Sequence, residues 1–60
     1  MNFENMRINA RFCMGLARYT VQKIAPGKVL CKCWGFRKWV TFEEMEKQSA
    51  FVEYWGDEEC

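Results

Sequence analysis

Two tight turns, separated by the length of one strand, constrain the fold more than any other feature of this sequence. Ala25-Pro26-Gly27 and Gly35-Phe36 are residue combinations that mark turns. The segments beside them are rich in β-branched and aromatic residues, which are typical of strands. We therefore expect residues 17–42 to form a three-stranded antiparallel meander.

The pairing of these strands follows from the length of each turn. A two-residue type II′ loop at Gly35-Phe36, with glycine first, predicts that Cys31 faces Val40. A three-residue loop at Ala25-Pro26-Gly27 predicts that Val21 faces Cys31. A slip of one residue would turn a whole strand over, so the agreement between the two turns supports the meander.

The alternation of side chains along strands divides the meander into two faces. The predicted core face holds Tyr19, Val21, Val29, Cys31, Cys33, Val40 and Phe42, with Lys38 near the turn. The opposite face holds Arg18, Lys32, Trp34, Arg37 and Trp39, together with Leu30 and Thr41. The first five residues of the second set are named the basic-aromatic face.

The segments on either side of the meander are predicted from local patterns. Residues 6–18 fit both a strand and a helix by periodicity, and Gly15 favours a strand that bends there. Thr41-Phe42-Glu43-Glu44 is a capping box, which predicts a short helix over residues 42–48. Residues 51–55 predict a last strand that ends before Gly56, and a continued helix is the rival interpretation.

Together these elements predict one small α+β domain over residues 1–60. It contains a small antiparallel sheet, made of the three-stranded meander plus edge strands, and one short helix. A small SH3-like barrel has this layout, although such an analogy carries no function. Because the chain is near the lower size limit for independent folding, stabilisation by oligomerisation or by a partner is a reasonable expectation.

Charge is distributed unevenly along the chain, although the net charge is only +1. Residues 5–42 contain no acidic residue, and their basic residues are Arg7, Arg11, Arg18, Lys23, Lys28, Lys32, Arg37 and Lys38. All the acidic residues except Glu4 lie in residues 43–60, beside one basic residue, Lys47. Such a division favours an anionic partner. Neutralisation of charge within or between copies of the chain is the simpler interpretation.

The four cysteines are Cys13, Cys31, Cys33 and Cys60. Their spacing contains no paired C-x2-C pattern, and the chain has no histidine. Cys31 and Cys33 lie two residues apart on one predicted strand, where they are poorly placed to bond each other. We therefore expect reduced thiols, no metal and no cofactor, with zinc and a structural disulfide as the alternatives.

Residue types that catalysis needs are scarce in this chain. There is no histidine and no glycine-rich phosphate loop, and Ser49, the only serine, has no base beside it. The carboxylates of residues 43–46 suit the positive end of a helix dipole. Cys31 and Cys33 are predicted in the core, where thiols are ordinary packing groups. We expect a protein that binds a partner and is not an enzyme.

The basic-aromatic face is the strongest functional signal in the sequence. Aromatic rings stack on unpaired bases and basic side chains attract phosphates, so a sheet that carries both favours single-stranded nucleic acid. Tryptophan and arginine are also enriched in protein interfaces, but lysine is depleted there. The opposing interpretation is that Trp34 and Trp39 are buried under the N-terminal segment or the helix, which would close a barrel.

We therefore expect a small regulatory binding module whose basic-aromatic face docks on an anionic partner, with single-stranded nucleic acid or RNA favoured. The alternative is an inhibitor or adaptor, of the type that bacteriophages encode, that blocks an acidic functional surface of a larger host protein. A third interpretation is a homo-oligomer in which acidic and basic segments of neighbouring copies meet. No segment has the composition of a signal peptide or a membrane span, so a cytoplasmic location is expected.

Overall fold

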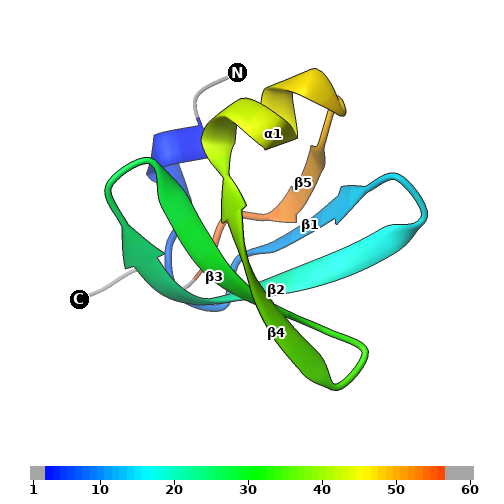
Figure 1. Ribbon diagram of the computed structural model, residues 1–60. Coiled ribbons are helices and arrows are strands. Elements are labelled where there is room, and N and C mark those ends of the chain that lie inside the picture. Colours follow the sequence, from blue (N-terminus) through cyan, green and yellow to red (C-terminus); the bar gives the residue numbers. More distant parts are fainter. Residues whose placement is uncertain (1–2, 57–60) are drawn as a thin grey trace.

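Tight turns and a short helix connect five antiparallel strands into one sheet in residues 3–56, the part of the chain that the computed structural model describes (Figure 1). The elements are η1 (a 3-10 helix, Phe3–Asn5), β1 (Arg11–Met14), β2 (Ala17–Ala25), β3 (Lys28–Cys33), β4 (Phe36–Thr41), α1 (Phe42–Lys47) and β5 (Phe51–Tyr54). The strand order is β4-β3-β2-β1-β5. This is the small α+β fold that the sequence predicts.

The turn between β3 and β4 lies one residue earlier than predicted. Its two loop residues are Trp34 and Gly35, not Gly35 and Phe36. Both have a positive φ, 49° for Trp34 and 89° for Gly35, as in a type I′ turn, so the predicted type II′ turn is wrong. Both turn types match the twist of the strands and both favour glycine, so a single glycine does not decide between them.

The earlier turn changes the partner of each residue on β4 by two positions. Val29 faces Val40, and Cys31 faces Lys38 instead of Val40. Side chains alternate with a period of two, so this shift leaves each of them on its predicted face. The observed register also places two fully buried valines opposite each other, a cross-strand pair that stabilises a sheet.

The turn between β2 and β3 contains two residues, Pro26 and Gly27, instead of the predicted three. Proline followed by a glycine with a φ of 76° is typical of a type II turn. Val21 nevertheless faces Cys31, as predicted, because the register shifts between Val21 and Lys23. This β-bulge adds one residue to β2, and it thereby compensates for the shorter loop and keeps Val21 in the core.

Within the segment whose periodicity fits both a strand and a helix, residues 11–18 form a hairpin, whereas residues 6–10 belong to neither a helix nor a strand. β1 pairs with β2, and the chain reverses completely at Gly15 and Leu16, so the strand interpretation is correct. Phe12 and Met14 are buried on the core face, whereas Leu16 is fully exposed in the turn. The predicted bend at Gly15 is therefore a tight turn.

Helix α1 begins where the capping box predicts and ends one residue earlier. The Thr41 hydroxyl, at the N-cap, accepts a hydrogen bond from the Glu44 backbone N–H at 3.1 Å. Beyond the helix, Ser49 has a φ of 53°, and the chain turns into β5. β5 pairs with β1, so the last strand is confirmed and the continued helix is wrong.

The core lies between one face of the sheet and the short helical segments. Its residues are Phe3, Met6, Ala10, Phe12, Met14, Tyr19, Val21, Val29, Cys31, Cys33, Val40, Met45 and Ala50. Phe42 is partly buried against this cluster, and the Lys38 ammonium lies 5.8 Å from the centre of the Tyr19 ring. The predicted core face is therefore confirmed, and the opposite face of the sheet points away from the core.

The sheet stays open at both edges. Within residues 3–56, β4 and β5 form the two edges and do not pair with each other. The order of the elements fits the layout of an SH3-like barrel, but because the sheet is not closed, a barrel is not confirmed.

Candidate functional site

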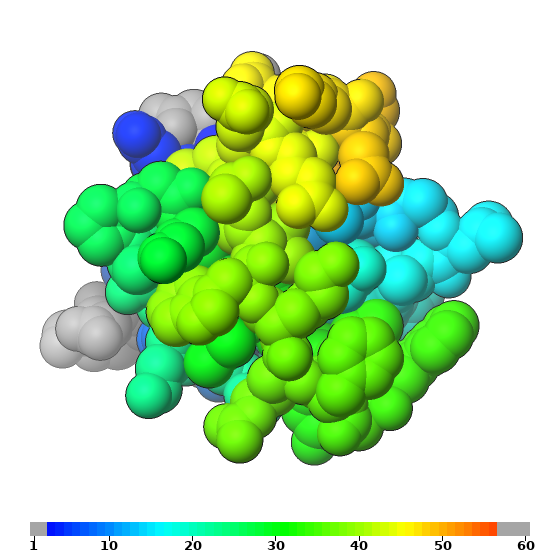
Figure 2. All heavy atoms as spheres, viewed as in Figure 1, coloured from blue at the N-terminus to red at the C-terminus, as the bar shows by residue number. Residues whose placement is uncertain are grey.

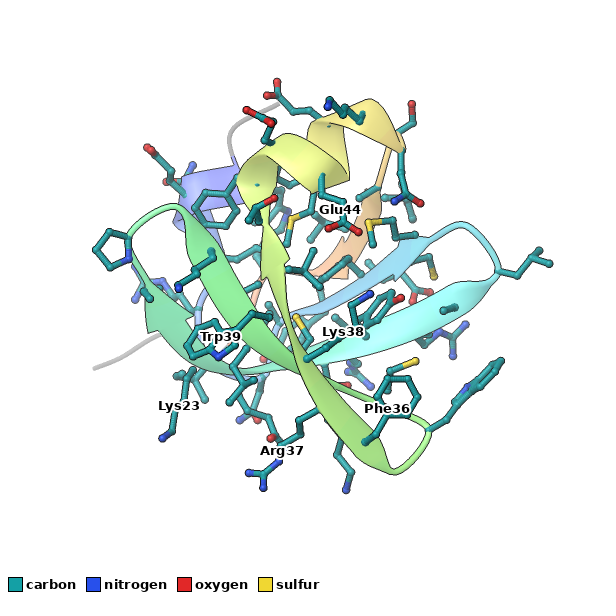
Figure 3. The ribbon with its side chains drawn as sticks, in the orientation of Figure 1. Lys23, Phe36, Arg37, Lys38, Trp39 and Glu44 are labelled. Atoms are coloured by element: carbon teal, nitrogen blue, oxygen red, sulfur yellow. The ribbon has the colours of Figure 1, made fainter. Side chains whose placement is uncertain are left out.

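All five residues of the basic-aromatic face are exposed, and the four that lie on strands point away from the core. Trp34 is 80% exposed and Trp39 is 46% exposed, so the interpretation that both indoles are buried is wrong. Figure 3 shows Arg37 and Trp39 on one side of the β4 ribbon and Phe36 and Lys38 on the other. The predicted side chains are therefore accessible to a partner.

Three of these residues border one open depression. Its lining consists of Arg18, Lys32 and Trp34 with Cys13, Gly15, Leu16, Ala17, Thr20 and Gly35. The depression measures about 650 Å³ and lies between the β1–β2 turn and the β3–β4 turn, which project at the same edge of the molecule in Figure 2 (cyan and green). It is named the inter-turn depression. Thr20 pairs with Lys32 across β2 and β3, which makes these side chains neighbours on its surface.

Arg37 and Trp39 extend the face along β4. Arg37 pairs with Lys32, so two cations are adjacent across neighbouring strands. Trp39 pairs with Leu30, and the Lys28 ammonium lies 5.0 Å from the centre of its ring, within the range of a cation–π interaction. Because Lys28 lies over this indole, Trp39 is less available than Trp34 for stacking on a ligand.

A carboxylate from the last strand also reaches this region. Glu53 Oε1 lies 3.0 Å from Arg18 Nε, and the Cys13 thiol donates to the same oxygen at 3.3 Å. Two interactions raise the pKa of Arg18 above its usual value. The larger effect comes from the hydrogen bond between the Arg18 and Cys13 side chains, and the next from the negative charge of Glu53. Arginine carries five N–H donors, more than this contact uses. The network therefore holds a guanidinium that retains donors at the margin of the inter-turn depression.

Trp34 has a backbone conformation that residues other than glycine rarely adopt. Its φ of 49° lies in the left-handed region, which costs an L-residue about 1–2 kcal/mol. The side chain is almost fully exposed, so burial against the described residues does not offset this cost. Backbone strain of this type is concentrated at functional sites. The position of Trp34 therefore argues for a role in binding and against a role in stability.

Charges are separated in space as well as in sequence. Glu43, Glu44 and Glu46 belong to α1 at the top of Figure 1, whereas the β3–β4 turn lies at the bottom. Figure 3 shows the same separation between Glu44 and Arg37. Among residues 3–56, neither Lys32 nor Arg37 has an ion-pair partner. An anionic ligand on this face would therefore meet two positive charges that no ion pair within residues 3–56 neutralises.

The described cysteines are unpaired thiols in two different environments. Cys13 is half-buried, Cys31 and Cys33 are buried, and Cys60 lies outside the described residues. Burial raises the pKa of Cys31 to about 12, against an opposite effect of the Lys38 charge. This thiol is therefore protonated and unreactive at neutral pH.

A metal site or a membrane-spanning helix would point to a different function. In residues 3–56, no three His, Cys, Asp or Glu side chains are placed to hold a metal ion together. None of the helices in this part of the chain has the length and apolar character needed to cross a membrane. The basic-aromatic face is therefore the feature from which we infer a function.

Several residues of the candidate site were not predicted, among them Leu16, Thr20, Lys28 and Glu53. Thr20 lies two residues after Arg18 on one strand, so alternation alone would have placed both on the same face. Recognition of Gly15 as the start of a turn would have exposed Leu16. Glu53 carries no such signal, because the pairing of β5 with β1 joins segments that are distant in the sequence.

No protein-family model, curated protein or solved structure is significantly similar to this chain. Its function must therefore be inferred from the side chains and the geometry of the face itself.

Proposed function

We propose that this chain is a small non-enzymatic regulatory module that binds single-stranded nucleic acid through its basic-aromatic face. The observation that carries the proposal is the exposure of Trp34 beside Arg18 and Lys32 at one open depression. Such a site offers an aromatic ring for an unpaired base and cations for the flanking phosphates. Arg37, next to Lys32, extends the positive surface along the path of a strand.

The form of the face favours a single strand over a duplex. Stacking of a base on an aromatic side chain contributes about 1–3 kcal/mol, and only an unpaired base exposes its ring faces to such contact. Helix α1 is six residues long and carries Glu43, Glu44 and Glu46, so it is unsuited to the major groove of a polyanion.

The test is a binding titration with a fluorescently labelled single strand of about 15 nucleotides, as DNA and as RNA, at about 50 mM and about 200 mM salt. We expect binding that weakens as the salt concentration rises. The double variant Lys32→Ala, Arg37→Ala reduces the slope of log K against log salt concentration by about 0.7 for each phosphate that it no longer neutralises. Lys47→Ala, which removes a positive charge from α1, is the matched control and leaves the slope unchanged. Absence of binding at low salt, or binding that is independent of salt, contradicts the proposal.

A larger protein with an acidic surface is the second candidate partner, and one observation favours it. Leu16, Trp34 and Phe36 expose apolar side chains in or beside two adjacent turns, and Leu16 is fully exposed. Tryptophan and arginine are enriched in interface hot spots, and Trp34 lies beside Arg18 at the inter-turn depression. A stoichiometric complex from host lysate that survives nuclease treatment supports this candidate, and a complex that nuclease abolishes supports nucleic acid.

A further inference from the structure

We propose that the inter-turn depression binds one unpaired guanine, which stacks on Trp34 and directs its O6 and N7 edge toward Lys32 and Arg18. The inference rests on the proposed function and adds the identity of the base. It follows from two properties of the site: the ring that is open to stacking and the type of polar group that lines the depression.

Trp34 is the aromatic residue of this face that is open to stacking. Lys28 lies over the ring of Trp39 at 5.0 Å, and the Arg11 guanidinium lies over the ring of Tyr54 at 5.2 Å. Trp34 has no such contact within residues 3–56, and it lines the depression, whereas Trp39 does not. A base that enters the depression therefore meets the Trp34 indole.

Donors predominate among the polar side chains of the depression. The Arg18 guanidinium and the Lys32 ammonium donate hydrogen bonds and accept none. The Thr20 hydroxyl does both, and the Cys13 thiol already donates to Glu53. A site of this composition favours a base edge that presents acceptors and no donor.

Guanine is the base that presents two acceptors and no donor on one edge. Its N7 and O6 are adjacent acceptors, and arginine or lysine on this edge is the most common specific contact of proteins with bases. Adenine presents a donor beside N7, cytosine presents an amino group, and thymine presents O4 as a single acceptor beside its methyl group. We therefore expect guanine to bind on the order of tenfold more tightly than adenine or thymine at this position.

Arg37 has a different role from Arg18 and Lys32 in the proposed binding. It is adjacent to Lys32 but does not line the depression, so it contributes attraction to the phosphate backbone and no choice of base. Arg37→Ala is therefore expected to weaken the binding of all oligonucleotides by the same factor, whereas Lys32→Ala reduces the preference for guanine.

The test compares labelled thymidine oligomers of about five nucleotides whose central base is thymine, adenine, guanine, hypoxanthine or 7-deazaguanine. Hypoxanthine keeps O6 and N7, and 7-deazaguanine lacks N7. We expect guanine and hypoxanthine to bind alike, and 7-deazaguanine, adenine and thymine to bind on the order of tenfold more weakly. Trp34→Ala removes the preference, and Trp39→Ala, the matched control, keeps it. Circular dichroism of each variant verifies that it is folded.

The outcomes separate this inference from the proposed function. Equal binding of all five oligomers overturns the choice of guanine and leaves single-strand binding in place. A preference that survives in Trp34→Ala and is lost in Trp39→Ala overturns the assignment of the stacking ring. Absence of binding to every oligomer at low salt overturns the inference and the proposed function together.

Discussion

At the scale of single residues, stability and the proposed binding make opposite demands on Trp34. A type I′ turn favours asparagine before glycine, because asparagine tolerates the left-handed conformation. Here the residue before Gly35 is Trp34. Tryptophan offers no such tolerance. It does present an exposed ring beside Lys32, which is what a stacking site needs.

The change Trp34→Asn tests this opposition. We expect it to raise the free energy of unfolding by about 1 kcal/mol, because it relieves backbone strain in the turn. The same change should weaken binding of a guanine-containing oligomer by on the order of tenfold, because the stacking ring is removed. Urea unfolding and fluorescence anisotropy measure the two effects. A variant that is less stable and binds as before contradicts both expectations.

Cys31 links stability to pH at the same scale. Burial raises the pKa of its thiol from 9.0 to about 12, so folding favours the protonated form. The stabilisation that results is complete below pH 9.0 and is lost as the pH rises from 9.0 toward about 12. We expect the free energy of unfolding to fall more steeply over this range in the wild type than in Cys31→Ala, which has no thiol to ionise. Urea unfolding at a series of pH values measures both slopes, and parallel curves would refute the expectation.

At the scale of elements, the start of α1 depends on one side chain. The Thr41 hydroxyl satisfies the Glu44 backbone N–H, and its loss should cost about 1 kcal/mol. We expect Thr41→Ala to lower the unfolding free energy by this amount, while Thr41→Ser retains most of it. Neither change should alter oligonucleotide affinity, because Thr41 does not line the inter-turn depression. A marked loss of affinity in a folded Thr41→Ala protein would place α1 in the binding site.

The elements also show what the sequence can and cannot predict. Strand faces follow from alternation, so the core residues and the exposure of Arg18 and Lys32 are predictable. Turn positions are less predictable. Gly35 suits two turn types, and a β-bulge in β2 adds one residue to the strand while the following loop is one residue shorter. The inter-turn depression depends on how two turns approach each other across the twisted sheet, and no local pattern encodes that.

At the scale of the whole molecule, the three carboxylates of α1 lie at the opposite end of the described residues from the β3–β4 turn (Figure 1). Strand β4, six residues long, separates α1 from the β3–β4 turn by about 20 Å, more than twice the Debye length of about 8 Å at physiological salt. Carboxylates on α1 therefore have little effect on a ligand at the inter-turn depression. Glu53 differs, because it binds Arg18 directly at the site.

A pair of substitutions with the same change of charge tests this arrangement. Glu53→Gln releases Arg18 for the ligand, and we expect it to tighten oligonucleotide binding by about threefold. Glu46→Gln removes a carboxylate from α1, and binding at physiological salt should remain unchanged. Titrations of both variants against the same labelled oligomer measure the difference. Equal effects of the two substitutions would show that only net charge matters, which is contrary to this account.

Backbone amide chemical shifts during an NMR titration with a guanine-containing thymidine oligomer show whether a single strand binds at the inter-turn depression. We expect progressive changes in residues 15–20 and 32–37, together with the Trp34 indole N–H, while the amides of α1 stay constant. Changes confined to α1 or to residues 3–8, or a spectrum that does not respond to the oligomer at low salt, would contradict binding at the inter-turn depression.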